Sequence, residues 1–401
     1  MSIVSASAPP VSAATRVGKR LVFYFSGFDP RGPAHYHTLY EAEAKAQAPL
    51  NGLNLTVGKR HRAGKLASAW SITAPGGTET EYEFLRWDDI IRRHWPKNEW
   101  QLLKSAVPVY WTFLTANLVP RLLKIAWPAA LTVSYPIVAF LAPMLIALAA
   151  GSIVTLLMLA KQWALWFSLL PALVIVAAAF FLTRWLDHRF RSYWLLRTYG
   201  TIQPWAYGKS PALDARIREF AEYIVERIHE SDADEVLVVG HSVGTILSIP
   251  LVVEMLRLDP ELGQRGPKFG LVSLGDCIPL VSLLPRSRKL REDLETVASA
   301  PGVHWVDFSA RRDGASVTQV DPLKVSGITR RPGIPVRPLL LPVRIFKMFP
   351  PDVYKVIKKD LFRIHFQYIM AGEFLTDYDF FAITAGPLGL ADRYPEPAAK
   401  A

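Results

Sequence analysis

Residues 240–244, Gly-His-Ser-Val-Gly, form the pattern in this chain that is best suited to chemistry. This G-x-S-x-G motif directly follows the apolar run Val236 to Val239 and directly precedes an apolar, helix-like run from 245 to 258. A serine exposed on a tight turn between a strand and a helix needs small residues two positions away on each side, because larger ones would clash. The N–H of Val243, at the helix N-terminus, would stabilise a developing oxyanion. The motif therefore predicts that Ser242 is a nucleophile, the alternative being an ordinary turn of small residues.

Patterns typical of strands and helices alternate on both sides of this motif. Strands are expected at 21–25, 53–57, 236–239, 269–274 and 303–308, and a hairpin at 67–73 and 80–86. Helices are expected at 33–48 and where apolar residues recur at steps of three and four, at Leu213, Ile217, Phe220, Ile224 and Ile228. The proline-rich, basic stretch 329–351 is expected to be a loop with short helical pieces. This alternation indicates an α/β fold with a mostly parallel sheet flanked by helices.

An uncharged stretch separates the two α/β parts. From Ile125 to Ala160 there is no Asp, Glu, Lys or Arg, and after Lys161 there is again none from Gln162 to Thr183. A hydrocarbon core about 30 Å thick needs roughly 20 apolar residues in a helix. We therefore expect two transmembrane helices, near 135–157 and 163–183, joined by a short turn at Lys161. The alternative is a buried helix pair of a large soluble domain, but such helices rarely run so long without charge.

Basic residues flank the uncharged stretch, at Arg121, Lys124, Arg184, Arg189, Arg191 and Arg197. Cytoplasmic segments next to membrane spans are enriched in Lys and Arg, so both α/β parts are expected in the cytoplasm, at a plasma or bacterial inner membrane. Residues 102–123 are expected to form an interfacial helix. Tryptophans near the span ends are expected to be interfacial anchors or core residues: Trp111, Trp127, Trp163, Trp166, Trp185 and Trp194.

The expected domain organisation follows from these segments. Residues 1–14 lack a basic start followed by an apolar core, so no signal peptide is expected. The expected parts are a disordered tail at 1–18, the first part of the enzyme-like domain at 19–100, the membrane insertion at 101–199, the second part at 200–385 and a tail at 386–401.

The motif and its flanks resemble the nucleophile elbow of the α/β-hydrolase superfamily of serine esterases and lipases, with the same strand, Gly-His-Ser-x-Gly turn and helix. The resemblance covers the segments 19–95 and 200–385 and implies an α/β-hydrolase fold that a transmembrane hairpin interrupts. Two features depart from the superfamily. Pro250 should kink or break the helix after the elbow, and no antiparallel strands precede Leu21.

The resemblance also implies the chain order serine, acid, histidine. Only His304 and His365 follow Ser242, and His304 lies in an expected strand before the acid, so His365 is the expected general base. Asp313, in the segment that ends an expected strand and opens a loop, lies where the superfamily places the acid that orients the histidine. The other candidate acids are Asp276, Asp307 and Asp321. A histidine on a helix face and a carboxylate solvated beside basic neighbours are the plain alternatives.

The turn after the first expected strand, residues 25–32, resembles the His-Gly turn of hydrolases with a serine in the histidine position. This resemblance implies a second oxyanion donor beside Val243, the N–H of Phe28 or, as an alternative, of Gly27. Glycines of this kind also occur as plain turn residues.

Composition restricts the remaining chemistry. Of 401 residues 51% are hydrophobic, which excludes a mainly disordered chain, and the single cysteine, Cys277, excludes an intrachain disulfide and fits a reducing compartment. No C-x-x-C, H-E-x-x-H or P-loop occurs, so no metal or cofactor is expected. The pair Asp88-Asp89 is expected to begin a helix rather than to bind a metal. The net charge of +11, with basic runs at 286–291 and 355–359, favours anionic lipid head groups over nucleic acid.

Together these features predict a membrane-anchored serine hydrolase that cleaves an ester or thioester, lipid-like or acyl, through an acyl-enzyme on Ser242 that water resolves. The expected partners are an anionic bilayer and an acyl or ester small molecule, without nucleic acid. The alternatives are an acyltransferase on the same fold, and a catalytically silent hydrolase domain that acts as a membrane scaffold or partner-binding module.

Overall fold

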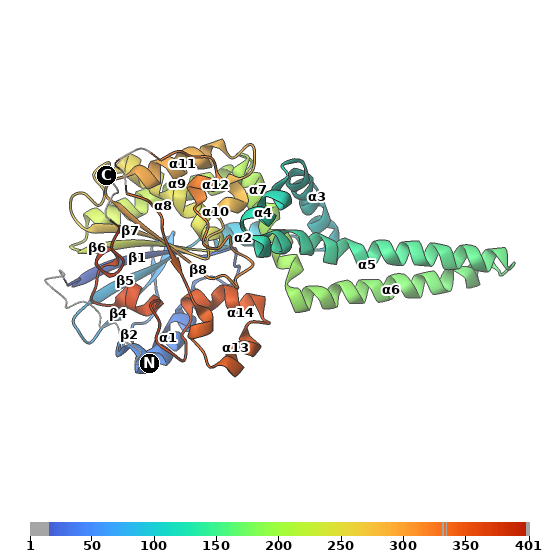
Figure 1. The fold of residues 1–401 in the computed structure, drawn as a ribbon, viewed down its shortest axis with the longest axis horizontal. Coiled ribbons are helices and arrows are strands. Elements are labelled where there is room, and N and C mark those ends of the chain that lie inside the picture. The colour runs from blue at the N-terminus through green and yellow to red at the C-terminus, as the bar shows by residue number, and fades with distance from the viewer. Residues whose placement is uncertain (1–15, 331–332, 334, 398–401) are drawn as a thin grey trace, which may run out of the picture.

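A computed structural model describes residues 16–330, 333 and 335–397 of the chain. Within these residues nine strands form one sheet, in the order β2-β4-β5-β1-β6-β7-β8-β9 with β3 beside β4 (Figure 1). The strands are β1 (Lys19–Phe25), β2 (Thr56–Val57), β3 (His61–Ala63), β4 (Ala67–Thr73), β5 (Glu79–Leu85), β6 (Glu235–His241), β7 (Lys268–Leu274), β8 (Val303–Ser309) and β9 (Leu339–Pro342). From β5 to β9 all neighbours are parallel, whereas β4 is antiparallel to β5, β2 and β3. The expected α/β class with a mostly parallel sheet is therefore confirmed.

Helices cover both faces of the sheet (Figure 1). Successive side chains of a strand point to opposite faces, so each central strand contributes to two cores. In β1, Leu21, Phe23 and Phe25 pack in one core, with residues of α8 (Pro211–His229), α9 (Val243–Leu258) and α11 (Arg288–Ser299). Val22 and Tyr24 pack in the other core, with residues of α1 (Pro33–Asn51), α14 (Leu361–Phe366) and α15 (Phe380–Ala385). Strands buried on both faces explain the continuous apolar runs in the sequence.

Further short helices complete the described part of the fold. They are α2 (Asp88–Arg93), α10 (Ile278–Ser282), α12 (Pro322–Val325), η1 (Ile345–Lys347), α13 (Pro351–Ile357), η2 (Gln367–Ile369) and α16 (Leu390–Arg393). Asp88 and Asp89 begin α2, as expected, and Arg92 and Arg93 end it, which complements the helix dipole.

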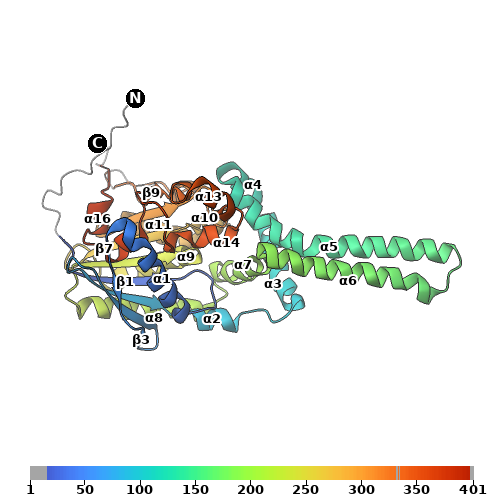
Figure 2. The same ribbon diagram turned by 90° about the horizontal axis from the view of Figure 1, so that it is seen from below.

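A long antiparallel helical hairpin projects from the α/β body (Figures 1 and 2). It consists of α5 (Trp127–Ala160) and α6 (Leu165–Phe190), and Lys161 lies in the turn between them. Helix α5 extends beyond the expected span 135–157 at both ends, whereas α6 begins after residue 163 and continues past residue 183. Gly151 allows close packing, since a Cβ there would lie 3.1 Å from the Cβ of Ala172. Both helices are long and apolar enough to cross a membrane, and only 17% and 11% of their most apolar windows are buried.

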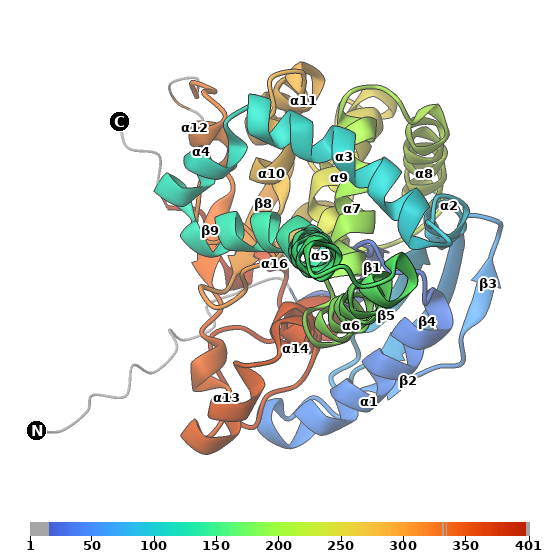
Figure 3. The same ribbon diagram turned by 90° about the vertical axis from the view of Figure 1, so that its right-hand side faces the viewer.

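Three helices join the hairpin to the body: α3 (Glu99–Thr115), α4 (Leu118–Ile125) and α7 (Ser192–Ala206) (Figure 3). They bury Phe113, Leu122 and Leu195 in one cluster with the first turns of α5. The segment 102–123, expected to be one interfacial helix, is two helices, because the chain turns at Asn117 with a left-handed φ of 50°. One apolar side of this pair is exposed, including Trp111 at 66%.

Several expectations for individual elements were wrong. The segment 53–57 is a strand only at Thr56–Val57, and the expected loop 329–351 contains the edge strand β9. Helix α9 runs through Pro250 without a break. Residues 386–397, expected to be a tail, include α16, whose Leu390 is buried. The expected tail at 1–18 lies outside the described residues up to 15, and Val17 is buried and donates its N–H to Pro387 O at 3.0 Å.

A buried ion pair connects the start of the central strands to the C-terminal segment. Arg20 Nε on β1 donates to Glu235 Oε2 on β6 at 2.6 Å, and both side chains are at most 2% exposed. The Arg20 guanidinium also donates to the carbonyls of Gly386 and Leu388. Glu235 Oε1 accepts the N–H of Leu390. Every strong polar group of the pair is therefore satisfied, as burial of two charges requires.

Arg20→Met should lower the free energy of unfolding by about 3–5 kcal/mol, because it leaves the Glu235 carboxylate buried without its partner. Arg265→Met, which breaks the exposed Arg265–Glu261 pair, is the matched control and should cost less than about 1 kcal/mol. Urea unfolding of both purified variants measures the difference. Equal losses would contradict the structural role of the buried pair.

Candidate active site

Ser242 occupies the sharp turn between β6 and α9. Its φ of 57° and ψ of −123° lie in a region that L-residues rarely adopt and that costs about 1–3 kcal/mol. Two hydrogen bonds hold this backbone: Ser242 N donates to Leu274 O on β7 at 2.9 Å, and Thr245 N donates to Ser242 O at 2.9 Å. The turn thus places Ser242 directly after the carboxyl end of β6 and at the N-terminus of α9.

The two motif glycines are required by close backbone approach. A Cβ at Gly244 would lie 2.0 Å from the carbonyl oxygen of Phe25, at the end of β1. A Cβ at Gly240 would lie 2.4 Å from Ser248 Oγ and 2.7 Å from Gly244 O. The expected reason for small residues on both sides of Ser242 is therefore confirmed.

The loop after β1 lies directly against Ser242. A Cβ at Gly27 would be 2.9 Å from the Cβ of Ser242 and 3.3 Å from its Oγ, so this position has room only for glycine. The structure thus brings Gly27, and with it the next residue Phe28, to the serine, while Val243 follows the serine at the helix N-terminus. Within the part of the chain that the structure describes, no acceptor is found for the N–H of Gly27 or Phe28.

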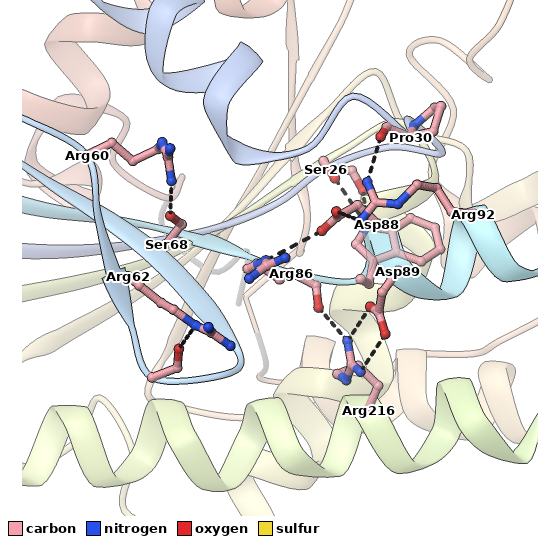
Figure 4. Close-up of polar contacts among 12 residues, drawn as sticks. Ser26, Pro30, Arg60, Arg62, Ser68, Arg86, Asp88, Asp89, Arg92 and Arg216 are labelled. Atoms are coloured by element: carbon pink, nitrogen blue, oxygen red, sulfur yellow. Dashed lines mark hydrogen bonds and ion pairs between the residues drawn. The ribbon is translucent and has the colours of Figure 1, made fainter.

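Helix α2 and its N-cap residue Trp87 hold this loop in place (Figure 4). Arg92 Nη1 donates to Pro30 O at 3.0 Å and forms an ion pair with Asp88. Trp87 Nε1 donates to Ser26 O at 3.2 Å. Asp89 forms an ion pair with Arg216 of α8 at 2.8 Å. The acidic pair therefore has a structural role, and among the described residues no group of three His, Cys, Asp or Glu is placed to hold a metal ion.

His365 and Asp313, 52 residues apart in sequence, form a buried pair. His365 Nδ1 lies 2.9 Å and 3.0 Å from the two carboxylate oxygens of Asp313, and both side chains are 1% exposed. The carboxylate also accepts hydrogen bonds from Ser316 Oγ at 2.9 Å and Tyr368 OH at 3.0 Å. Burial alone would raise the pKa of Asp313, but the charge and hydrogen bond of His365, together with the hydrogen bonds of Ser316 and Tyr368, outweigh it and hold the pKa below its usual value. Asp313 is thus an anion that accepts the Nδ1–H of His365.

The other nitrogen of His365 is left without a hydrogen bond within the described residues. His365 Nε2 is buried and has no hydrogen-bond partner in the described part of the chain, so Ser242 Oγ is not bonded to it. The thiol of Cys277, which shares a cavity lining with Ser242, donates to the carbonyls of Gly275 at 3.5 Å and Ala315 at 3.4 Å, and burial raises its pKa well above its usual value. Catalytic hydrogen bonds are often long when no substrate is bound. Rotation about the Cα–Cβ bond of Ser242 redirects its hydroxyl between staggered positions.

His241, the residue before the serine, positions His365. Its Nε2–H donates to the backbone carbonyl of His365 at 2.9 Å, and the two rings are 5.2 Å apart. The ring is fully buried between His365 and Tyr24. Burial, followed by the charge of His365, lowers the pKa of His241 to about 3, so the side chain is neutral at physiological pH.

The alternative acids and the alternative histidine have other partners. Asp321 caps α12 and pairs with Arg330 at 2.5 Å, and His304 lies 3.4 Å from Glu396. Burial raises the pKa of Asp276 to about 7. Burial and the charge of Asp276 raise the pKa of Asp307 well above its usual value. None of these four contacts His365 through a hydrogen bond, so Asp313 is the acid that the fold brings to the histidine.

Trp194 was expected to be an interfacial anchor or a core residue, and it lies at the site. Its Nε1 donates to Phe28 O at 2.7 Å, and its ring is 6.1 Å from that of His365. Trp194 also separates two hollows: an apolar cavity of about 30 Å³ at Ser242 and a pocket of about 610 Å³ at His365. Helix α7, which follows the hairpin, therefore touches both the loop after β1 and the histidine.

The sequence did not indicate that three of these supporting residues belong to the site. Tyr368 follows His365 by three residues, and Ser316 follows Asp313 by three, so short-range spacing was the available signal. For Trp194 no local signal existed, because its contacts are with residues far away in the sequence.

Comparisons of the chain with protein-family models, with curated proteins and with solved structures gave no match.

The depressed pKa of His241 predicts a specific acid sensitivity. In the unfolded chain His241 has the ordinary histidine pKa of about 6.5, so below this pH the unfolded chain binds a proton that the folded protein does not bind. The free energy of unfolding therefore falls as the pH drops from about 6.5 toward 3. His241→Gln removes this titration and should gain roughly 2 kcal/mol relative to wild type between pH 7.5 and pH 5. Urea unfolding at pH 7.5, 6 and 5 tests this. A wild-type-to-variant difference that is the same at all three values would contradict it.

Proposed function

We propose that this protein is a membrane-anchored serine hydrolase of the α/β-hydrolase superfamily that cleaves a lipid-like or acyl ester or thioester. The observation that carries the proposal is the convergence of three groups at one end of the sheet. Ser242 lies on a strained strand-to-helix turn, Gly27 lies against it, and the buried His365–Asp313 pair lies beside His241 with a free Nε2. These are the roles of nucleophile, oxyanion loop, base and orienting acid.

In the proposed reaction Ser242 Oγ attacks the acyl carbon while His365 Nε2 takes its proton. Asp313 holds the imidazole in the tautomer with hydrogen on Nδ1 and stabilises the imidazolium that forms. The N–H groups of Val243 and Phe28 stabilise the tetrahedral oxyanion. The intermediate expels the leaving group, which receives the proton from His365, and water then hydrolyses the acyl-enzyme by the same steps.

The hairpin supports the membrane part of the proposal. Its outward side chains are large and apolar, for example Leu156 at 65%, Trp166 at 79% and Phe181 at 71% exposure. A soluble protein rarely exposes an apolar surface of this extent. The uncharged part of α6 from 165 to 183 spans about 28 Å at 1.5 Å per residue, close to the hydrocarbon thickness of a bilayer. Basic residues flank the uncharged stretch, for example Lys124, Arg184 and Arg189, and this charge distribution supports a cytoplasmic α/β body.

Ser242→Ala should abolish labelling by a fluorophosphonate probe and lower ester turnover by about a thousandfold or more, because the probe and the reaction both need an activated serine. His365→Ala should lose about as much turnover, since members of a triad act as a unit. Asp313→Asn should lose somewhat less while the protein stays folded. The assay is short-chain ester hydrolysis by detergent-solubilised protein, with thermal unfolding recorded for each variant.

Asp321→Asn is the matched control, because Asp321 is a helix cap remote from His365 and should act through stability alone. A folded His365→Ala protein with normal turnover would refute the assignment of the base. Wild-type protein that shows neither labelling nor turnover would favour a silent scaffold, and an acylated product other than the free acid would favour acyl transfer.

The topology is tested with the single cysteine as background, because Cys277 is buried and reacts poorly with bulky reagents. Lys161→Cys should react with a membrane-impermeant maleimide in intact cells, and Arg16→Cys should react only after permeabilisation. Labelling is read by a mass shift on a gel. The reverse pattern would show that the α/β body lies on the outer side.

A further inference from the structure

The pocket beside His365 carries an unbalanced positive charge. It has a volume of about 610 Å³ and its lining includes four exposed basic residues: Arg189, Arg191, Arg312 and Lys359. None of the four forms an ion pair with a carboxylate in the described ranges 16–330, 333 and 335–397. The one acidic residue in the lining, Asp360, accepts the N–H of Arg363 at the start of α14. Four cations around one hollow attract an anionic group.

An apolar groove between α5 and α6 opens into this pocket. The groove has a volume of about 890 Å³ and is lined almost entirely by apolar side chains of the hairpin, among them Ala142, Ile146 and Ala178. The groove and the pocket share five lining residues at their junction: Thr132, Tyr135, Phe190, Arg312 and Leu361. A hydrocarbon chain lying in this groove would therefore hold a polar head at the basic residues.

On the other side of Trp194 the space at Ser242 is small. The apolar cavity there has a volume of about 30 Å³ and includes Val243, Cys277 and Val281 in its lining. A cavity that holds a single water molecule has a volume of about 10–15 Å³, so this cavity has room for a group of a few heavy atoms. It adjoins the basic pocket through Trp194, Leu195 and Ala315, which line both.

The chemistry of the triad decides which half of a substrate lies in each space. The general acid, His365, must reach the atom of the leaving group, so the leaving group lies in the basic pocket and the acyl group lies in the cavity at Ser242. We propose that the substrate is a short-chain acyl ester or thioester whose leaving group is an anionic amphiphile, with its phosphate or carboxylate at Arg312 and Lys359 and its hydrocarbon chain in the α5–α6 groove. This inference rests on the proposed hydrolase function. The bond cleaved is the acyl C–O or C–S bond, and the products are the short acid and the amphiphilic alcohol or thiol.

The test compares three esters with the same acetyl group and the same hexadecyl ether chain on glycerol, presented in neutral maltoside micelles. Their third position carries a phosphate, a phosphocholine or a free hydroxyl. The kcat/KM of wild-type protein should be about tenfold or more higher for the phosphate than for the free hydroxyl. Micelles without lipid phosphate ensure that the preference reports the substrate's own anion and not a bilayer head group.

The charge-matched variants locate the effect. Arg312→Gln with Lys359→Gln should lower the phosphate-to-hydroxyl ratio of kcat/KM about tenfold. Arg311→Gln with Lys355→Gln removes the same charge from neighbouring exposed residues outside the pocket and should keep the wild-type ratio. Ala142→Phe, which fills the groove, should lower kcat/KM for the hexadecyl phosphate substrate about tenfold, whereas Ala149→Phe on the outer side of α5 should not.

Equal kcat/KM for the three esters, or equal effects of the two charge-matched pairs, would overturn the anionic head group. Equal rates for the hexadecyl phosphate ester and its analogue without the hydrocarbon chain would overturn the groove. A higher rate for a palmitoyl than for an acetyl ester of the same alcohol would overturn the short acyl group. Failure of the proposed function itself differs from all of these, because no ester would turn over and Ser242 would not react with fluorophosphonate.

Discussion

The close packing of the first turn of α9 against the end of β1 is the constraint on which the candidate site depends. At Gly244 even one carbon would collide with the Phe25 carbonyl, and at Gly27 it would collide with Ser242. Ser242 lies between these contacts with a φ of 57°, at a cost of about 1–3 kcal/mol that the surrounding hydrogen bonds and core packing offset. The same contacts place the serine side chain, the helix N-terminus and the loop after β1 together.

Electrostatic differences among buried carboxylates then decide which one is available to a histidine. Asp276, Asp307 and Asp313 are all fully buried near the carboxyl ends of β7 and β8. Asp313 meets an imidazole and two hydroxyl donors and stays ionised, whereas Asp276 and Asp307 lie near each other with few donors and have raised pKa values. Like charges in a dry environment cannot both ionise, so partners and not burial distinguish the three.

The hairpin contributes residues to the surroundings of the candidate site. Its two helices line a groove and a pocket that end at His365, and the helix that follows it supplies Trp194 between the two hollows. In the proposed membrane-anchored hydrolase, a hairpin built in this way would present a substrate that stays at the bilayer surface. Coupling of this kind requires the insertion to be rigidly packed on the body, which the buried cluster of α3, α4, α5 and α7 provides.

The sequence by itself determined the α/β class, the elbow at residues 240–244 and the apolar hairpin, because apolar periodicity, turn glycines and missing charges act over short distances. It also restricted the acid and the histidine to a few candidates, though only through a family resemblance. Tertiary structure alone decided that Asp313 and not Asp276 meets His365, that His241 holds the histidine's backbone, and that Trp194 belongs to the site. It also decided that 339–342 is an edge strand and that α9 continues through Pro250. These outcomes depend on contacts between residues far apart in the chain, and no local pattern encodes such contacts.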